Sequence, residues 1–456
     1  MKLLNRIIIA YFLVLVFLSI YFWLERSVFI DNSFYVFHLV KSSFFSVNHL
    51  RIGGLFPQLP ALGGVLMGLS LKSVSILFSI GFVLYYISIG YILYKIQSYQ
   101  WLFVLILSQC LITGHTFFWI ASELSPALAF TILTMALIER KIESFKQTNL
   151  LEFFLPVFFF IGVFFHPLNS IAMVGVLGFQ FFSKKETRAQ YGKYLISYSS
   201  LWLLRLIFIK TPYETGASAG METFWQNLPN FLNLTSTKQM MSHIPGGLFL
   251  LPLSFVFLIG WYLKHKQYIQ LFLLASGVLG MIVLINVNFT QGGEAFYMEN
   301  LYQVPAFFIA YAIGMGPLKT LDMRLSAFVI VGFILIAFSR IVIASPLYTN
   351  RLNWYQDIVN KTENLSNKKL IIPKSDLPMD TLLMTWCSAY EIWQLSTMMK
   401  EQSRSILLEE SDGQLGWIEG DRTKFHTQFE NFETNSLNPR YFIFNDTTAY
   451  KRYRLK

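Results

Sequence analysis

Long apolar runs separated by short hydrophilic loops are the feature that most constrains how this chain can fold. By hydropathy there are about eleven such runs, the first at residues 7–23 and the last at residues 327–344. A run of about 20 apolar residues can cross the hydrocarbon core of a bilayer as a helix. Since 54% of the 456 residues are hydrophobic and only 14% are charged, the sequence predicts an α-helical polytopic membrane protein.

Basic residues gather in every second loop. If the N-terminus is cytoplasmic, these short basic loops all fall on the inner side, as the positive-inside rule requires. We therefore expect a multi-pass protein of the cell inner (cytoplasmic) membrane, in contact with anionic lipids. The net charge of +10 then needs no nucleic acid as a partner. The basic loop residues are Lys95, Arg140, Lys141, Lys184, Lys185, Arg188, Lys193, Lys264, Lys266, Lys319 and Arg324.

The chain divides into two predicted parts. Residues 1–345 form a transmembrane domain, in which two long outer loops, residues 25–73 and 210–247, interrupt the series of spans. Because an odd number of spans precedes them, residues 346–456 are expected on the periplasmic or otherwise extracytoplasmic side. In the first outer loop, residues 33–45 mix aromatic and polar side chains, which predicts a helix lying in the membrane interface.

The hydrophilic C-terminal part shows short strand patterns around a helical one. Residues 368–373 and 405–410 predict strands, residues 381–399 predict a helix, and residues 441–444 predict a last strand. This order predicts a small α/β domain. The two cysteines of the chain are too few for a disulfide framework or a metal-ligand cluster, so no metal site is predicted.

Ionisable side chains at membrane depth are costly and are functional candidates by default. Here they gather at the predicted outer ends of the spans, whereas the inner halves of the same helices are nearly free of charge. Any one of them can simply reach the interface or tie two helices together. As a group they predict a polar cavity open to the outer side, lined by Asp31 and at least two other charged residues. These candidates are Arg51, His166, Arg205, Glu299 and Arg340.

Asp31 is the strongest candidate for chemistry. An isolated carboxylate near the hydrocarbon boundary has a raised pKa and can act as a general base. The alternative is that Asp31-Asn32-Ser33 caps a helix that begins at Phe34. Arg51 likewise has two interpretations, because it can grip a phosphate with two hydrogen bonds or anchor its loop at lipid headgroups.

The order of these features resembles that of the GT-C-type integral membrane glycosyltransferases. In that superfamily a long first outer loop carries a catalytic acid soon after the first helix, then interfacial helices, then a basic stretch with proline. Later outer turns and a soluble tail after the last span are also similar. The positions that carry the resemblance are Asp31, residues 33–45, Arg51, residues 58–60 (QLP), residues 165–167 (FHP) and residues 297–305 (YMENLYQVP).

The resemblance implies an enzyme that moves a sugar from a polyprenyl-phosphate donor to a glycan, lipid or protein acceptor on the outer face of the membrane. Asp31 would be the catalytic base, and Arg51 would hold the phosphate leaving group. The chain lacks the second acid that the commoner family pattern has beside the first, which leaves dependence on a divalent cation open. The resemblance further implies substrate-binding roles for Gln58, His166, Arg205, Glu299 and Arg340.

Two other classes of function compete with this interpretation. One is a lipid or polysaccharide transporter or flippase, against which we see neither a pair of broken helices nor an internal repeat in the sequence. The other is a non-enzymatic membrane scaffold that binds a partner through its tail. A scaffold would leave the outer charged residues without a shared role.

Overall fold

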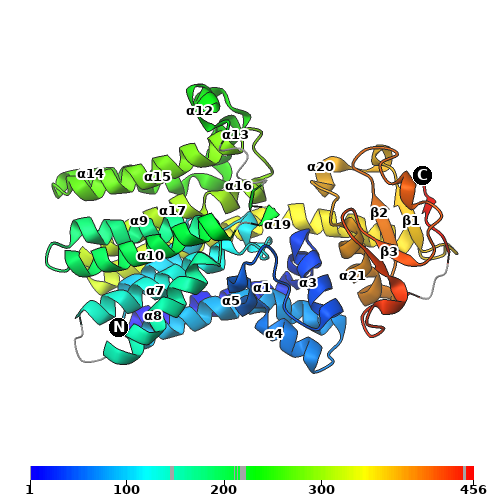
Figure 1. Cartoon of the computed structure of the whole chain (residues 1–456), viewed down its shortest axis with the longest axis horizontal. Helices are drawn as coiled ribbons and strands as arrows, with labels where there is room; N and C mark the ends of the chain where they lie inside the picture. The colour runs from blue at the N-terminus through cyan, green and yellow to red at the C-terminus, as the bar shows by residue number, and fades with distance from the viewer. Residues whose placement is uncertain are drawn as a thin grey trace.

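The chain folds into a bundle of long helices joined to a small α/β unit. The computed structural model describes every residue except 1, 144–147, 210, 213, 216–221, 445–447 and 456, so part of the predicted outer loop at 210–247 lies outside the described residues. The longest helix, α19 (Met323–Lys361), runs from the bundle into the C-terminal unit, residues 362–455 (Figure 1). The N-terminus lies at the end of the bundle farthest from this unit.

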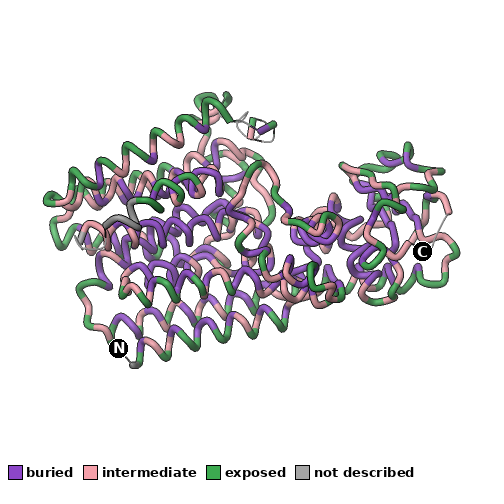
Figure 2. Tube along the Cα trace, turned by 60° about the horizontal axis from the view of Figure 1, so that its bottom comes forward, coloured by how far each residue is buried: buried purple, intermediate pink, exposed green. Residues whose placement is uncertain are grey.

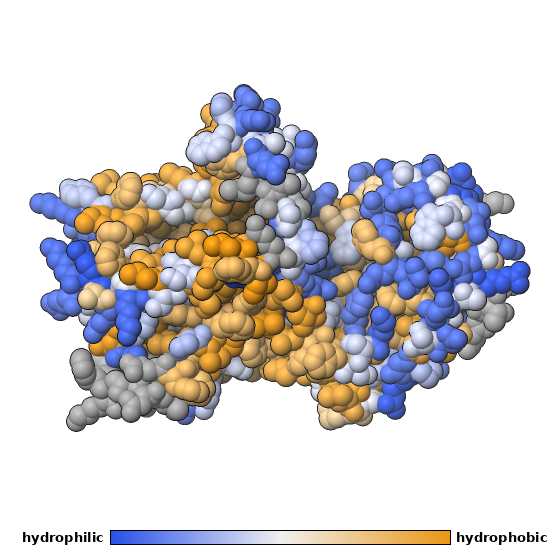
Figure 3. All heavy atoms as spheres, in the orientation of Figure 1, coloured by the Kyte–Doolittle hydropathy of each residue, from blue (hydrophilic) through white to orange (hydrophobic). Residues whose placement is uncertain are grey.

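Apolar sequence forms the long helices of the bundle, as predicted. On the face seen in Figure 3, hydrophobic side chains dominate the middle of the bundle, whereas hydrophilic ones gather on the C-terminal unit and at the opposite end of the bundle. The helices are α1 (Lys2–Tyr21), α5 (Leu71–Lys95), α6 (Tyr99–Cys110), α7 (Leu124–Glu143), α8 (Thr148–Val163), α9 (Pro167–Ser183), α10 (Arg188–Phe208), α14 (Leu250–Lys264), α15 (Tyr268–Asn288) and α17 (Gln303–Met315), besides α19.

The structure does not confirm the eleven spans that the sequence predicts. Among the described residues, four helices are long and apolar enough to cross a membrane, or up to six if each of two bent helix pairs counts as one span. Several predicted spans are helices of 10–17 residues, which are shorter than the roughly 20 residues that the hydrocarbon core requires. The protein is therefore a helical membrane protein, and a count of eleven spans is not confirmed.

Two helix pairs are bent, which the sequence analysis did not anticipate. α13 (Thr235–His243), continued to Leu248, meets α14 at 87°, and α16 (Ala295–Leu301) meets α17 at 50°. The expectation that the chain has no pair of broken helices is therefore wrong. Both bends follow sequence that interrupts a helix, since Pro245 with two glycines precedes α14 and Pro305 lies at the start of α17.

The predicted interfacial helix at residues 33–45 is α3 (Asp31–Ser42), and its apolar face is covered by protein instead of lipid. Phe37 is fully buried, with its ring 4.8 Å from that of Tyr390 and 5.1 Å from that of Trp393, both on α21 (Ser388–Lys400). An amphipathic pattern indicates which face of a helix is buried but not what covers it. The interfacial prediction is thus wrong for this face of α3.

Shorter helices fill the connections between the long helices, and all of them except α18 lie outside the end of the bundle where α19 begins. Beyond α3, the first outer loop forms α4, on which Phe56, Leu59 and Leu66 are exposed. The short elements are α2 (Trp23–Ser27), η1 (Ile52–Gly54), α4 (Leu55–Leu66), η2 (His115–Phe117), α12 (Phe224–Asn227), η4 (Leu228–Asn233), η5 (Ile244–Leu248) and α18 (Pro317–Thr320).

The C-terminal unit contains a three-stranded parallel sheet. β1 (Lys369–Ile372) lies between β2 (Ser405–Leu408) and β5 (Lys451–Arg452). The strands predicted at residues 368–373 and 405–410 are therefore confirmed. The strand predicted at residues 441–444 is wrong, because β5 takes that edge of the sheet. The remaining elements are η6 (Lys374–Asp376), α20 (Met379–Leu382), η7 (Gly416–Ile418), the antiparallel pair β3 (Lys424–His426) and β4 (Asn431–Glu433), and η8 (Thr434–Ser436).

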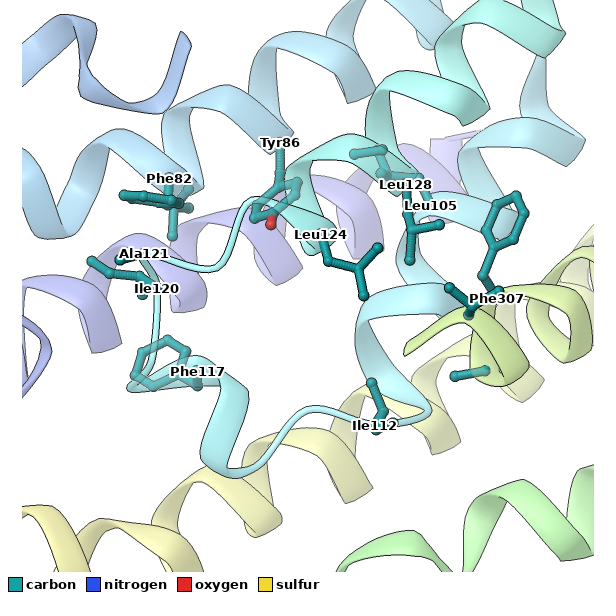
Figure 4. Close-up of a cluster of buried hydrophobic side chains, with 14 of the residues drawn as sticks. Phe82, Tyr86, Leu105, Ile112, Phe117, Ile120, Ala121, Leu124, Leu128 and Phe307 are labelled. Atoms are coloured by element: carbon teal, nitrogen blue, oxygen red, sulfur yellow. The ribbon is translucent and has the colours of Figure 1, made fainter. Parts of the chain in front are cut away.

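One hydrophobic core continues from the bundle into the C-terminal unit. Buried residues run without interruption through the bundle helices to α3 and α21 (Figure 2). The irregular segment between α6 and α7, residues 111–123, passes through this core: Ile112, Phe117 and Ile120 point among side chains of the surrounding helices (Figure 4). The helix α19 also continues without a break through residues 345 and 346, the boundary predicted from the sequence. The bundle and the C-terminal unit therefore share one helix and one hydrophobic core.

Candidate functional site

The buried segment 111–123 organises the polar side chains at this end of the bundle. An irregular segment in an apolar core must have its backbone groups bonded by other means than a helix. Arg26 donates to the Phe117 carbonyl. Asn32, which is fully buried, donates to the Phe118 carbonyl at 2.7 Å and accepts from the Ala121 N–H at 2.9 Å.

Glu299 and Arg340 serve the same segment from its other side. Arg340 donates to the carbonyls of Leu111 and Ile112 at 3.1 and 3.2 Å and to Glu299 at 3.1 Å. Glu299 accepts from the Thr116 N–H at 2.9 Å. Both side chains are buried, and both guanidinium Nη atoms of Arg340 and the Glu299 carboxylate have partners inside the protein.

Asp31 contacts the later part of the same segment, at Trp119. Its Oδ2 accepts a hydrogen bond from the indole Nε1 of Trp119 at 2.9 Å. The helix α3 begins at Asp31 itself, its N-cap is Ile30, and no side chain caps it. The alternative that Asp31-Asn32-Ser33 caps a helix starting at Phe34 is therefore wrong, and the Asp31 carboxylate is directed to Trp119.

Glu123 supplies a second acid near Asp31. It is distant in sequence, and its carboxylate accepts from Arg51 Nη1 at 2.9 Å and from the Tyr35 hydroxyl. Arg51 and Glu123 are both largely buried, with side chains 12% and 9% exposed. In the sequence Asp31 has no second acid beside it. The fold brings the Arg51–Glu123 ion pair near Asp31, whose carboxylate is bonded to Trp119.

Electrostatics make Asp31 suitable for proton transfer near neutral pH. Burial raises the pKa of Asp31 to about 7; the hydrogen bond from Trp119 lowers it, the charges of Glu123 and Glu391 raise it, and the charge of Arg51 lowers it. A carboxylate with this pKa is ionised in a large fraction of molecules at pH 7 and is basic enough to accept a proton.

His166 and Arg205 border the same region. Burial lowers the pKa of His166 well below its usual value, and the charges of Arg51 and Arg205 lower it further. The imidazole is therefore neutral, and its Nδ1 accepts from the Leu168 N–H at 3.2 Å, which caps α9. Arg205 donates to Glu214 at 2.5 Å.

Two contacts fix the loop that carries Arg51. A Cβ atom at Gly53 would lie 2.1 Å from the Phe165 ring, so glycine is required where the 165–167 turn packs on this loop. The Gln58 amide accepts from the Ser46 N–H and donates to the carbonyls of Ser46 and Gly54, each at 2.9 Å. The geometry thus gives Gln58 a role in holding the loop.

A cavity of about 60 Å³ lies deeper in the bundle. Trp119, Thr116 and Arg26 line it together with side chains from α1, α5, α6, α17 and α19. None of the predicted site residues lines it, so this cavity is not the outward cavity that the sequence predicts. Trp119 separates it from Asp31, because its indole lines the cavity and bonds the carboxylate.

The described residues contain no group of three or more His, Cys, Asp or Glu side chains placed to hold a metal ion. A comparison of the chain with protein-family models, with curated proteins and with solved structures found no match.

Sequence reasoning missed three residues of this site. Trp119, Tyr35 and Glu391 lie 88, 4 and 360 positions from Asp31 along the chain. No local pattern distinguishes Tyr35 or Glu391. For Trp119 a signal was available, since it stands four residues before Glu123 in the connection between two long apolar runs. Glu391 lies within a helical pattern, and only the tertiary fold brings it to Asp31.

Proposed function

We propose that this chain is a membrane glycosyltransferase that moves a sugar from a polyprenyl-phosphate donor to an acceptor on the outer face of the membrane. The observation that carries the proposal is the half-buried Asp31 carboxylate, which accepts a hydrogen bond from Trp119 and has its pKa raised to about 7. Deprotonating a hydroxyl acceptor requires such a base. Arg51, which is held by its ion pair with Glu123, supplies a positive charge near Asp31.

In the proposed reaction the acceptor hydroxyl lies against Asp31 and the donor phosphate lies towards Arg51. Asp31 takes the hydroxyl proton as the acceptor oxygen attacks the anomeric carbon, and the bond from that carbon to the phosphate oxygen breaks. The polyprenyl phosphate leaves with the bonding electrons, and the charge of Arg51 stabilises it. Glu123 keeps Arg51 in place, and His166 and Arg205 border the donor side.

The roles implied for Glu299, Arg340 and Gln58 change in this proposal. The hydrogen-bond groups of these side chains bond the segment 111–123 or the loop before α4. We therefore assign them to shaping the site, and the substrate contacts to Asp31, Arg51, His166 and Arg205.

The experiment that tests the proposal compares two carboxylate-to-amide variants in lipid nanodiscs, with radiolabelled polyprenyl-phosphate sugars as donors. Asp31→Asn keeps an oxygen that can accept from Trp119 but loses basicity, so transfer should fall by roughly a hundredfold to ten-thousandfold. Asp322→Asn is the control, because Asp322 only caps α19, accepting from the N–H groups of Arg324 and Leu325. Near-normal transfer by Asp31→Asn would contradict the assignment of the base.

A transporter is the second candidate, because the two bent helix pairs are a feature of transporters that bind substrate at broken helices. The bend between α16 and α17 lies next to Glu299. A flux assay in proteoliposomes with the same lipid-linked sugars separates the candidates. Movement of intact donor without sugar transfer would favour the transporter.

A further inference from the structure

The turn in front of Asp31 is held by an acid from the C-terminal unit. The Ile30 N–H donates to Glu391 Oε1 at 2.8 Å. Ile30 has φ 41° and ψ −116°, a conformation that β-branched residues avoid. Such a backbone persists only where its surroundings hold it, and this hydrogen bond is part of that hold, one residue before the carboxylate.

Glu391 is itself fixed by a buried ion pair. Arg351 on α19 donates to both carboxylate oxygens of Glu391, at 2.9 Å to Oε2. The side chains are 1% and 0% exposed. Arg351 also donates to the carbonyls of Leu382 and Met384 at 2.8 and 3.1 Å. Glu391 therefore cannot turn away from Ile30 without leaving a buried charge unpaired.

The pair joins three separate parts of the molecule at one point. Arg351 lies in the helix that leaves the bundle, Glu391 lies on α21, and Ile30 lies in the turn between α2 and α3. On the bundle side, the same turn is fixed by Asn32, which donates to the Arg26 carbonyl at 2.7 Å. The position of Asp31 between these two anchors thus depends on the C-terminal unit.

We infer that Glu391, held by Arg351, is a positioning residue that fixes the Ile30–Asp31 turn and thereby sets the position of the Asp31 carboxylate. The inference rests on the proposed function, because only that function makes the position of the Asp31 carboxylate important for catalysis. It assigns the C-terminal unit a part in building the site in addition to any contact with the acceptor. The groups that face Asp31 from the surrounding elements are Trp119, Glu123, Arg51, Glu391 and the thiol of Cys387.

The chain offers a matched control within the same unit. Glu409 is 0% exposed and accepts from Arg452 at 2.8 and 2.9 Å and from the Leu415 N–H at 3.0 Å. Like Glu391, it combines a bidentate arginine with a backbone N–H, but its partners all lie in the C-terminal unit. A variant at Glu409 therefore loosens the unit without touching the Ile30 turn.

The test uses full-length protein in nanodiscs without substrate. Glu391→Asp withdraws the acceptor from Ile30, so amide hydrogen exchange in residues 29–32 should become faster. Glu391→Gln removes a negative charge that raises the pKa of Asp31, so the protonation midpoint of Asp31 should fall below its wild-type value of about 7. The midpoint is read from the carboxylic acid band in infrared spectra, isolated by subtracting the Asp31→Asn spectrum. Glu409→Asp and Glu409→Gln should change neither quantity.

Unchanged exchange and midpoint in the Glu391 variants would overturn the inference, as would equal changes in the Glu409 variants. If Glu391→Gln does not fold, the double variant Arg351→Gln with Glu391→Gln replaces it, because it leaves no buried charge unpaired. The same two quantities are then measured on the double variant. Transfer is then assayed with the same lipid-linked sugars, and Glu391→Asp should lower its rate by about a hundredfold, as a misplaced catalytic group does. If the Glu391 variants move Asp31 but Asp31→Asn transfers normally, the proposed function fails and the positioning contact stands.

Discussion

Replacing Glu299 with Gln should destabilise the protein strongly without removing any residue that we assign to substrate. The change leaves the Arg340 charge buried, with its side chain 6% exposed, and without its carboxylate partner. Breaking a buried ion pair on one side costs about 3–5 kcal/mol. Arg340→Gln should cost a similar amount, because the Leu111 and Ile112 carbonyls also lose their donor.

A double-mutant cycle isolates the contribution of the pair. The coupling between the two substitutions should be about 1–3 kcal/mol, the range for residues in direct contact. The assay is equilibrium unfolding in mixed micelles, followed by circular dichroism. Glu363→Gln, which removes an exposed ion pair with Lys400, is the control and should leave stability close to that of the wild type.

The reasoning would be refuted if both single variants kept their stability within about 0.5 kcal/mol of the wild type but lost donor binding. That result would mean that Glu299 and Arg340 are available to substrate, as the family resemblance implies, and that their contacts with the segment 111–123 contribute little.

Further predictions concern pH, packing and topology. Transfer should fall as pH drops below about 7, because Asp31 must be ionised to accept a proton; a pH–rate profile checks this. Since the folded state raises this pKa above the usual 3.8, the contribution of Asp31 to stability should decline as pH rises from 3.8 towards 7, and Asp31→Asn should unfold at a higher temperature than the wild type at pH 8. Phe37→Ala should cost about 3–5 kcal/mol in unfolding experiments, because it empties the contact between α3 and α21. Cysteines introduced at Lys185 and Lys451, both exposed, should be labelled from opposite sides of the membrane.

The sequence predicts the local features of this fold well. Apolar runs become the long helices, and residues 368–373 and 405–410 become neighbouring strands, because hydrophobic pattern and strand propensity act over a few residues. The segment at 441–444 is also apolar, with aromatic and β-branched residues, but it forms no strand. Strand pairing depends on which partner is near in space, and β5 occupies the edge of β1.

The site was predictable only in part for the same reason. Asp31 and Arg51 stand out in the sequence because charge near a membrane is rare. Trp119 does not, since it reaches Asp31 only through the buried path of the segment 111–123. Burial also changes the interpretation of Glu299 and Arg340, because a polar side chain at membrane depth can be needed to bond a buried backbone as well as a substrate.

We propose that Asp31 and Arg51 form the reaction centre, and the place where polyprenyl phosphate binds decides whether they do. A cryo-electron microscopy map of the protein in nanodiscs with bound polyprenyl phosphate should show the phosphate beside Arg51, on the side that faces Asp31. A phosphate bound instead at the Glu299–Arg340 pair, or in the cavity beside Arg26, would contradict the account.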